Sequence, residues 1–294
     1  LWFTRPACVK AIRMTRDRLL LLDVGGTFIK CSDGRVIPVN SDGSREEVSA
    51  SFREAVAAFC SEALSHPELR CGIALAIPGP FDYVKGIFRM KHKYASVEGE
   101  DFRVLAGVPD CVELRYTHDV NGMLSGEMSF GNGRGYSRVA LVTLGTGLGF
   151  SMSLDGEIIR NDMGSPRVSI FRLPCRDGIL EDYVSKRGIL SIFASFGGKA
   201  YTVKEVAALA TAGDWAAQES FSEAASLLSS ALYPIISGYG IECLLFGGQI
   251  SRSFEFMEDA LRRGLAGLDC LRHIGPVSDF DNATFNGLRS IFEL

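Results

Sequence analysis

The chain has 294 residues, with 31 Lys and Arg against 35 Asp and Glu, and 47% of its residues are hydrophobic. This length suits two domains of ordinary size better than one. The net charge of −4, with no block of five or six like charges, gives no reason to expect nucleic acid or an anionic membrane as a partner. No apolar run, including the one at residues 19–22, approaches the roughly 20 residues of a membrane span, so we expect no membrane partner.

The first thirteen residues differ in character from the rest of the chain. Residues 1–13 lack an initiating Met, carry Arg5, Lys10 and Arg13, and precede Met14. They contain no apolar run of the kind that a signal peptide requires, so we interpret them as a non-native or disordered extension of a cytoplasmic protein. The eight cysteines include no Cys-x-x-Cys pair, and this spacing indicates reduced thiols rather than a disulfide framework or a zinc site.

The pattern of apolar residues up to residue 128 predicts a first unit of strands and helices. Asp33-Gly34 is a hairpin signal between two short strands, and Pro78-Gly79-Pro80 ends a buried apolar run. Three strands, a helix, two further strands and a second helix are predicted, in this order, over residues 19–24, 27–31, 36–37, 46–64, 71–77, 112–116 and 119–128.

The same plan then begins again. Three strands are predicted at 139–144, 150–154 and 157–159, with Asp155-Gly156 as the second hairpin turn. Helices come next over 178–196, from Thr202 (where Glu205 completes a capping box) and over 214–237, and the last strand covers 242–246. The chain is therefore predicted to be an α/β protein built from two copies of one βββαβα unit, each about 120 residues long, facing one another across a cleft.

A glycine turn comes directly after the first strand. Asp23 ends the strand, and Gly25, Gly26 and Thr27 offer unobstructed backbone N–H groups, a hydroxyl and a carboxylate that can hold hydrated Mg²⁺. This combination suits a polyphosphate, although two adjacent glycines can also simply make a tight hairpin.

Two more glycine motifs occur at matching places in the second copy. The first of them, Gly145, Thr146 and Gly147, repeats the turn at Gly25. Either turn alone could be a plain hairpin, but two plain hairpins at matching places of a repeat are a poor explanation. Gly247 and Gly248 come after the last strand and would let a flat ligand such as adenine lie against bare backbone, although a plain strand-to-helix turn has the same composition.

Asp119 stands between an apolar strand and a helix. A carboxylate at the carboxyl end of a strand can take the proton from an attacking hydroxyl. Asp is also among the best helix N-caps, and the local sequence does not separate these two roles.

Five motifs in this order resemble those of the ROK family of sugar kinases and repressors, within the superfamily of hexokinase, actin and Hsp70-type ATPases. They cover residues 20–30, 77–82, 117–127, 144–149 and 246–251. The resemblance extends over about residues 17–290 and implies a two-domain actin-like (ribonuclease H-like) fold. It implies an N-terminal α/β domain at 14–117, rejoined by a C-terminal helix at 282–294, and a C-terminal α/β domain at 118–281.

The resemblance also implies a function and its residues. The chain would be an ATP-dependent kinase of a hexose or hexose derivative, with Asp119 as the general base and Asp23 as the partner of Mg²⁺ or the nucleotide phosphates. The two glycine turns would bind the β- and γ-phosphates, and Gly247 and Gly248 would lie under the adenosine. The sugar would be bound by Gly79, His118, Asp119 and Glu181.

The departures from the family pattern concern the sugar. His118 stands where the family usually has Asn, and the segment 161–168 lacks the Glu and His that grip the sugar and bind zinc. The family's cysteine cluster survives only as Cys175, so structural zinc is not expected. Glu181 matches a second sugar-binding carboxylate, although a solvated residue in the first turn of a helix would look the same.

A second function remains open on the sequence alone. The altered sugar motif also fits a sugar or nucleotide sensor that has no catalytic activity. A DNA-binding repressor is disfavoured, because only about 18 residues precede the first phosphate motif. A homodimer formed through the C-terminal domain is a further expectation from the resemblance.

Overall fold

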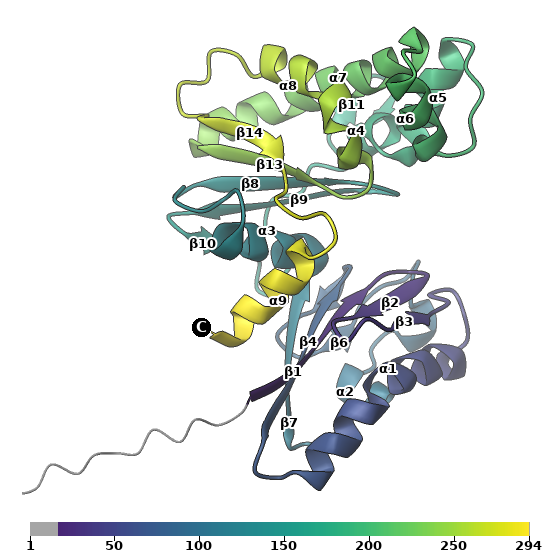
Figure 1. Ribbon diagram of the computed structural model, residues 1–294, viewed down its shortest axis with the longest axis vertical. Helices are drawn as coiled ribbons and strands as arrows, with labels where there is room; N and C mark the ends of the chain where they lie inside the picture. Colours follow the sequence, from purple (N-terminus) through teal and green to yellow (C-terminus); the bar gives the residue numbers. More distant parts are fainter. Residues whose placement is uncertain (1–16, 294) are drawn as a thin grey trace, which may run out of the picture.

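The predicted apolar runs form two five-stranded mixed sheets in the computed structural model, which describes residues 17–293 (Figure 1). The extension at residues 1–13 lies outside the described residues. The first sheet has the order β3-β2-β1-β4-β7. Its strands are β1 (Asp17–Val24), β2 (Phe28–Cys31), β3 (Val36–Pro38), β4 (Arg70–Ile77) and β7 (Val112–His118).

The second sheet repeats this topology with the order β10-β9-β8-β13-β14. Its strands are β8 (Val139–Leu144), β9 (Leu148–Leu154), β10 (Glu157–Ile158), β13 (Cys243–Gly247) and β14 (His273–Pro276). In both sheets the first three strands are joined by antiparallel pairing, and the last two are added in parallel. The predicted α/β class and the duplicated βββαβα plan are confirmed. The prediction that 242–246 is the last strand is wrong, because β14 follows β13 and pairs with it in parallel.

Helices cover both faces of each sheet, which explains why the central strands β1, β4, β8 and β13 are apolar over most of their length rather than alternating. In the first sheet, Leu20 and Leu22 belong to a core with Phe52 of α1, whereas Leu21 faces Leu288 of α9. The helices of this half are α1 (Arg45–Ser65), α2 (Phe102–Ala106), α3 (Asp119–Phe130) and the 3₁₀ helix η1 (Ala95–Val97). Its small second hairpin consists of β5 (Phe81–Asp82) and β6 (Ile87–Phe88).

The outer face of the second sheet carries most of the helices. Phe221 and Leu228 of α7 pack there against Val142 and Phe246 of the strands. This layer consists of α4 (Leu180–Val184), α5 (Lys186–Ser195), α6 (Val203–Thr211), α7 (Trp215–Tyr239), η2 (Ile250–Phe256) and α8 (Glu258–Gly264), with a short hairpin of β11 (Pro174–Cys175) and β12 (Gly178–Ile179). No helix within residues 17–293 is both long enough and apolar enough to cross a membrane.

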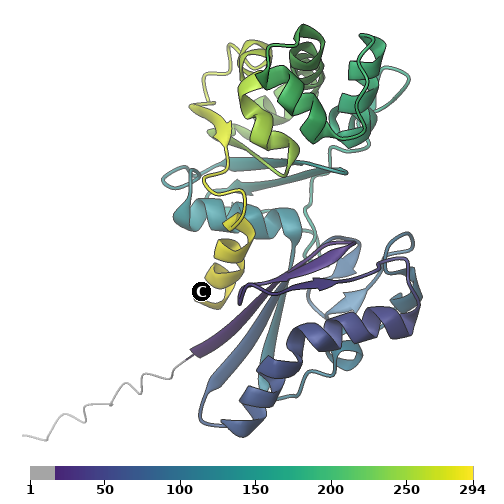
Figure 2. The ribbon, with the colours of Figure 1, turned by 45° about the vertical axis from the view of Figure 1, so that its right-hand side comes forward.

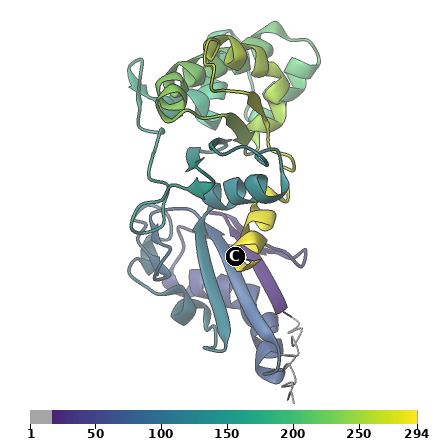
Figure 3. The same ribbon diagram turned by 90° about the vertical axis from the view of Figure 1, so that its left-hand side faces the viewer.

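The two halves exchange a helix. The helix α3 follows the first sheet but packs on β8 and β9 of the second, and α9 (Ala283–Glu293) follows the second sheet but packs on β1 and β4 of the first. Both helices lie between the sheets (Figures 2 and 3). They contact one another directly, because a Cβ on Gly287 would lie only 1.7 Å from the Gly122 carbonyl oxygen and one on Gly126 only 2.1 Å from that of Ala283.

One predicted helix is wrong. Residues 178–196 form the strand β12 and two helices, and the helices α4 and α5 are separated at Ser185, whose ψ is −175°. The break brings the chain onto the second glycine turn, where the Lys186 amide donates to the Gly145 carbonyl at 2.9 Å. The capping boxes of α1 (Ser44 with Glu47) and α6 (Thr202 with Glu205) are both formed.

Candidate active site

Two carboxylates meet at one edge of the first sheet. The strands β1, β4 and β7 are parallel, and Asp23 is aligned with Ala76, which is aligned with Thr117. Asp23 and Asp119 therefore both lie at carboxyl ends of strands, at the edge that faces the second sheet (Figure 1). They lie close enough for the Asp119 charge to raise the pKa of Asp23.

The Asp119 carboxylate is held in its ionised form. Burial raises its pKa, but the adjacent His118, the Val120 amide and the charge of Lys93 outweigh burial and leave the pKa below its ordinary value. His118 Nδ1 lies 2.6 Å from Asp119 Oδ1, and the Val120 amide donates to the same oxygen at 2.7 Å. The side chain of Asp119 is nevertheless 48% exposed, so a substrate hydroxyl can reach it.

His118, rather than Asp119, occupies the N-cap position of α3. Its ring lies against Gly79 and Tyr83: a Cβ on Gly79 would come within 3.3 Å of the ring, and the ring centroids of His118 and Tyr83 are 5.7 Å apart. The Tyr83 hydroxyl in turn donates to the Ile77 carbonyl at 2.9 Å. Three of the residues predicted to bind a sugar, Gly79, His118 and Asp119, are therefore neighbours.

The first glycine turn is held in place by hydrogen bonds to other segments, and part of it is exposed to solvent. The Gly25 amide donates to the Phe28 carbonyl at 2.9 Å, and the Gly25 carbonyl accepts from the Tyr94 hydroxyl at 2.5 Å. The Gly26 carbonyl accepts from the Ser41 amide at 3.1 Å. Thr27 is exposed. The turn thus has a set shape and an accessible surface, as phosphate binding requires.

Asp23 has the properties of a ligand for hydrated Mg²⁺. Burial raises its pKa to about 6, Lys30 opposes this shift, and Asp119 adds to it. Its carboxylate accepts no hydrogen bond from any other residue between 17 and 293. No group of three or more His, Cys, Asp and Glu side chains in the same range could enclose a metal ion. One carboxylate without protein donors fits Mg²⁺, which keeps several waters and takes its other ligands from phosphates.

The raised pKa predicts that Asp23 destabilises the protein without ligands. A carboxyl whose pKa is raised by folding costs stability as the pH rises from about 4 to about 6, and the full cost persists above pH 6. Asp23→Asn should therefore raise the free energy of unfolding at pH 7.5 by about 1 to 3 kcal/mol. Urea unfolding at pH 7.5 and at pH 4 measures this, and the gain should shrink severalfold at pH 4. The exposed Asp42→Asn is the control, and an Asp23→Asn gain that is the same at both pH values would contradict the assignment.

The second glycine turn and the third glycine pair lie side by side. Gly247 is aligned with Thr143 on the neighbouring parallel strand. Gly248 has a φ of +83°, and a Cβ there would lie 2.3 Å from the Leu144 carbonyl oxygen, so only glycine fits. A Cβ on Gly145 would meet nothing within 4 Å, and Thr146 and Gly147 are exposed. Gly248 therefore lies directly against the strand end that leads into the second glycine turn, whereas Gly247 is buried.

Glu181 lies on the second glycine turn. Its carboxylate accepts from the Leu148 amide at 2.9 Å and lies 3.3 Å from the Arg187 guanidinium. In the described part of the chain, no hydrogen bond or ion pair joins Glu181 to His118 or Asp119. The contacts of Glu181 in this range are with the second glycine turn and Arg187, and its place in a sugar site stays a prediction.

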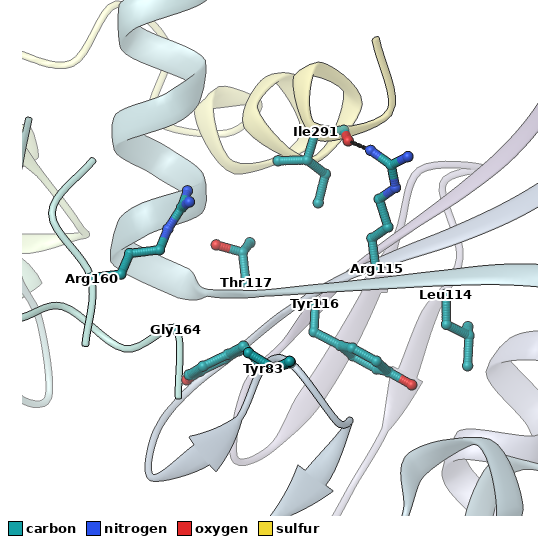
Figure 4. A pocket seen from close by; sticks show the side chains of 9 residues that line it. Tyr83, Leu114, Arg115, Tyr116, Thr117, Arg160, Gly164 and Ile291 are labelled. Atoms are coloured by element: carbon teal, nitrogen blue, oxygen red, sulfur yellow. Dashed lines mark hydrogen bonds between the residues drawn. The ribbon is translucent and has the colours of Figure 1, made fainter. Parts of the chain in front are cut away.

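A pocket of about 330 Å³ lies beside β7, between Tyr83 and Ile291 of α9 (Figure 4). It is lined by Tyr83 and Val84, by 114–117 of β7, by Arg160 and Gly164, and by Ile291 of α9. The loop that carries Gly164 is held by the fully buried Asn121, whose amide donates to the Gly164 carbonyl at 3.1 Å and accepts from the Ser151 hydroxyl at 2.7 Å. Asn121 lies two residues after Asp119, in the motif at 117–127 that resembles the ROK family, and its place in that motif is the only sign in the sequence that it supports the site.

The remaining residue that sequence reasoning missed is Lys93. It lies in a loop between β6 and η1, beside Gly26 and near Asp119. No motif covers it, and the only trace of it in the sequence is a Lys-His-Lys run at 91–93.

Comparisons with known proteins agree with this geometry. N-acetylgalactosamine kinase AgaK of Shewanella sp. (strain ANA-3) is 23% identical over 273 residues, which cover 80% of this chain and 83% of that protein. A ROK family glucokinase from Streptomyces griseus, solved with glucose and AMPPNP, superposes with a TM-score of 0.69 at 21% identity, covering 92% of this chain and 98% of that one.

A ROK family transcriptional regulator, a homologue of the E. coli MLC protein, has a TM-score of 0.77 at 16% identity and covers 94% of this chain and 78% of that chain. These likenesses confirm the predicted actin-like fold. The profile of the ROK family matches residues 20–268, which is most of the chain. The protein therefore belongs to the ROK family.

Proposed function

We propose that the protein is an ATP-dependent sugar kinase that transfers the γ-phosphoryl group to a hydroxyl of a hexose or hexose derivative. The observation that carries the proposal is the pairing of an ionised, accessible Asp119 with Asp23 at one sheet edge. The accessible backbone of the two glycine turns supplies the phosphate-binding surface that this chemistry needs. The relatives named as kinases of N-acetylgalactosamine and glucose support the same class of reaction.

Asp119 would act as the general base. Its carboxylate accepts the proton of a sugar hydroxyl, in our proposal the primary one, as the hydroxyl oxygen forms a bond to the γ-phosphorus and the bond from phosphorus to the β–γ bridging oxygen breaks. His118 orients the carboxylate through its Nδ1 contact at 2.6 Å. Amides that follow in the two glycine turns, at Gly26 and Thr27 and at Thr146 and Gly147, would donate to phosphate oxygens, and Gly247 and Gly248 would lie under the adenosine.

Asp23 would hold the hydrated Mg²⁺ of the nucleotide. When bound, Mg²⁺ neutralises charge on the phosphate oxygens. Gly79 and His118 would contact the sugar. Glu181 would contact the sugar through the same carboxylate that accepts from the Leu148 amide at 2.9 Å.

Release of ADP that depends on an added sugar tests this function. The panel should contain hexoses, amino sugars and acylated amino sugars, because a site built around one pattern of hydroxyls rejects others strongly. We expect one of these groups to give ADP release well above the rate without sugar. Sugar and nucleotide binding without turnover across the whole panel would instead favour the sensor, a function that the fold it shares with the ROK regulator also permits.

The same proposal includes the organisation of the protein. We propose two domains, 14–117 with the helix 282–294 and 118–281, which close around the substrates and exclude water. We also propose that the protein forms a homodimer and that it is located in the cytoplasm, where ATP is available. The absence of structural zinc stays a prediction, and metal analysis of the purified protein would test it.

A further inference from the structure

The backbone at Lys93 is fixed to the first glycine turn through its neighbour. Tyr94 is fully buried, its amide donates to the Ser41 carbonyl at 2.6 Å, and its hydroxyl donates to the Gly25 carbonyl at 2.5 Å. The Tyr94 ring also packs against Phe52 and Phe88, with centroid distances of 5.8 and 5.7 Å. The segment that carries Lys93 therefore keeps a constant position relative to the turn.

The side chain of Lys93 lies near both the turn and the proposed base. Its Cδ and Cε atoms are each 3.8 Å from the position that a Cβ on Gly26 would take. Its charge also reaches Asp119, whose pKa it lowers. Lys93 is half-buried, and its ammonium group makes no hydrogen bond or ion pair with any residue from 17 to 293. A partly desolvated cation without an anionic partner marks a place for an anion.

We propose that Lys93 is a further catalytic residue, and that its ammonium group donates hydrogen bonds to oxygens of the phosphoryl group that is transferred. This inference rests on the proposed function and adds a residue to it. During transfer the sugar oxygen–phosphorus bond forms, the bond to the bridging oxygen of ADP breaks, and the proton goes to Asp119. Lys93 stays protonated throughout and stabilises the charge on the phosphoryl oxygens.

The test compares two nucleotides that differ in the γ-phosphate. Calorimetric titration with Mg²⁺-AMPPNP and with Mg²⁺-ADP should show that Lys93→Gln binds AMPPNP about 10-fold more weakly than the unaltered protein, because a hydrogen bond to a charged group is lost. Binding of ADP should change by less than about 2-fold, since ADP lacks the contacted group. With the active sugar, kcat of Lys93→Gln should fall by at least about 100-fold.

Lys91→Gln is the matched control. Lys91 carries the same charge in the same loop, but its side chain is 81% exposed and lies 3.9 Å from Glu98. This variant should bind both nucleotides and turn over as the unaltered protein does. Lys93→Arg, which keeps the charge, should recover part of the discrimination between AMPPNP and ADP and confirms that the variants at this position fold.

The outcomes separate this inference from the proposed function. Equal weakening of AMPPNP and ADP, or an effect on the sugar KM alone, would overturn the role of Lys93 while sugar-dependent turnover of the unaltered protein keeps the kinase assignment intact. If the unaltered protein binds neither nucleotide, both fail together. If it binds both without turnover, preferential loss of AMPPNP in Lys93→Gln still supports the contact with the terminal phosphate.

Discussion

Asp119→Asn is expected to lower kcat by about 100- to 10,000-fold, because the amide cannot accept the proton of the sugar hydroxyl. The substitution preserves size and shape at the first position of α3, where the Val120 amide donates to the side-chain oxygen. The fold and the affinity for Mg²⁺-ADP should therefore remain close to those of the unaltered protein. Single-turnover measurement of sugar phosphate formation, with ADP titration alongside, checks both expectations.

Asp214→Asn is the control for that substitution. Asp214 caps α7 and accepts from the Ala217 amide at 2.8 Å, and it belongs to none of the proposed site motifs. Asn caps helices as well as Asp does, so stability and turnover should both be unchanged. Turnover by Asp119→Asn at the unaltered rate would refute the assignment of the base, whatever the sugar.

The order of elements was accessible from the sequence because the first strand of each sheet is an apolar run that ends in a glycine turn. Residues 19–24 and 139–144 were predicted as equivalent first strands, and β1 and β8 occupy equivalent places in their sheets. The hairpin signals at Asp33-Gly34 and Asp155-Gly156 fixed the direction of the next strand in each sheet. Both faces of β1 and of β8 are buried, so their apolar runs show no alternation.

Other features depend on contacts between distant segments, which no local pattern records. The break between α4 and α5 exists because Lys186 docks on Gly145, and a continuous apolar periodicity hid it. Lys93 reaches the site only because Tyr94 is bonded to Gly25, 69 residues away. The proximity of Gly79, His118 and Asp119 results from the register of β4 with β7. The chemical roles of these residues stay predictions until the variants are measured.

The exchange of α3 and α9 was the least accessible feature, and it leads to the prediction with the largest effect on stability. Gly287→Ala is expected to lower the free energy of unfolding by about 3 kcal/mol, because the added methyl group would meet backbone that cannot rotate away. The Cβ would lie 1.7 Å from the Gly122 carbonyl oxygen and 2.9 Å from the Gly126 amide nitrogen. Urea unfolding at neutral pH measures the change.

A Gly→Ala substitution where no other atom lies close to the new methyl group is expected to raise the free energy of unfolding instead. Gly238 lies in α7 and a Cβ there would meet nothing within 4 Å, so Gly238→Ala should stabilise the protein by up to about 1 kcal/mol through reduced backbone freedom in the unfolded chain. An unchanged stability of Gly287→Ala would contradict this prediction, and it would mean that α3 and α9 can move apart at little cost. Asp119 is the first residue of α3, so a movement of α3 would also move the proposed base relative to the first sheet. In that case kcat of Gly287→Ala should fall, even at temperatures where the protein stays folded.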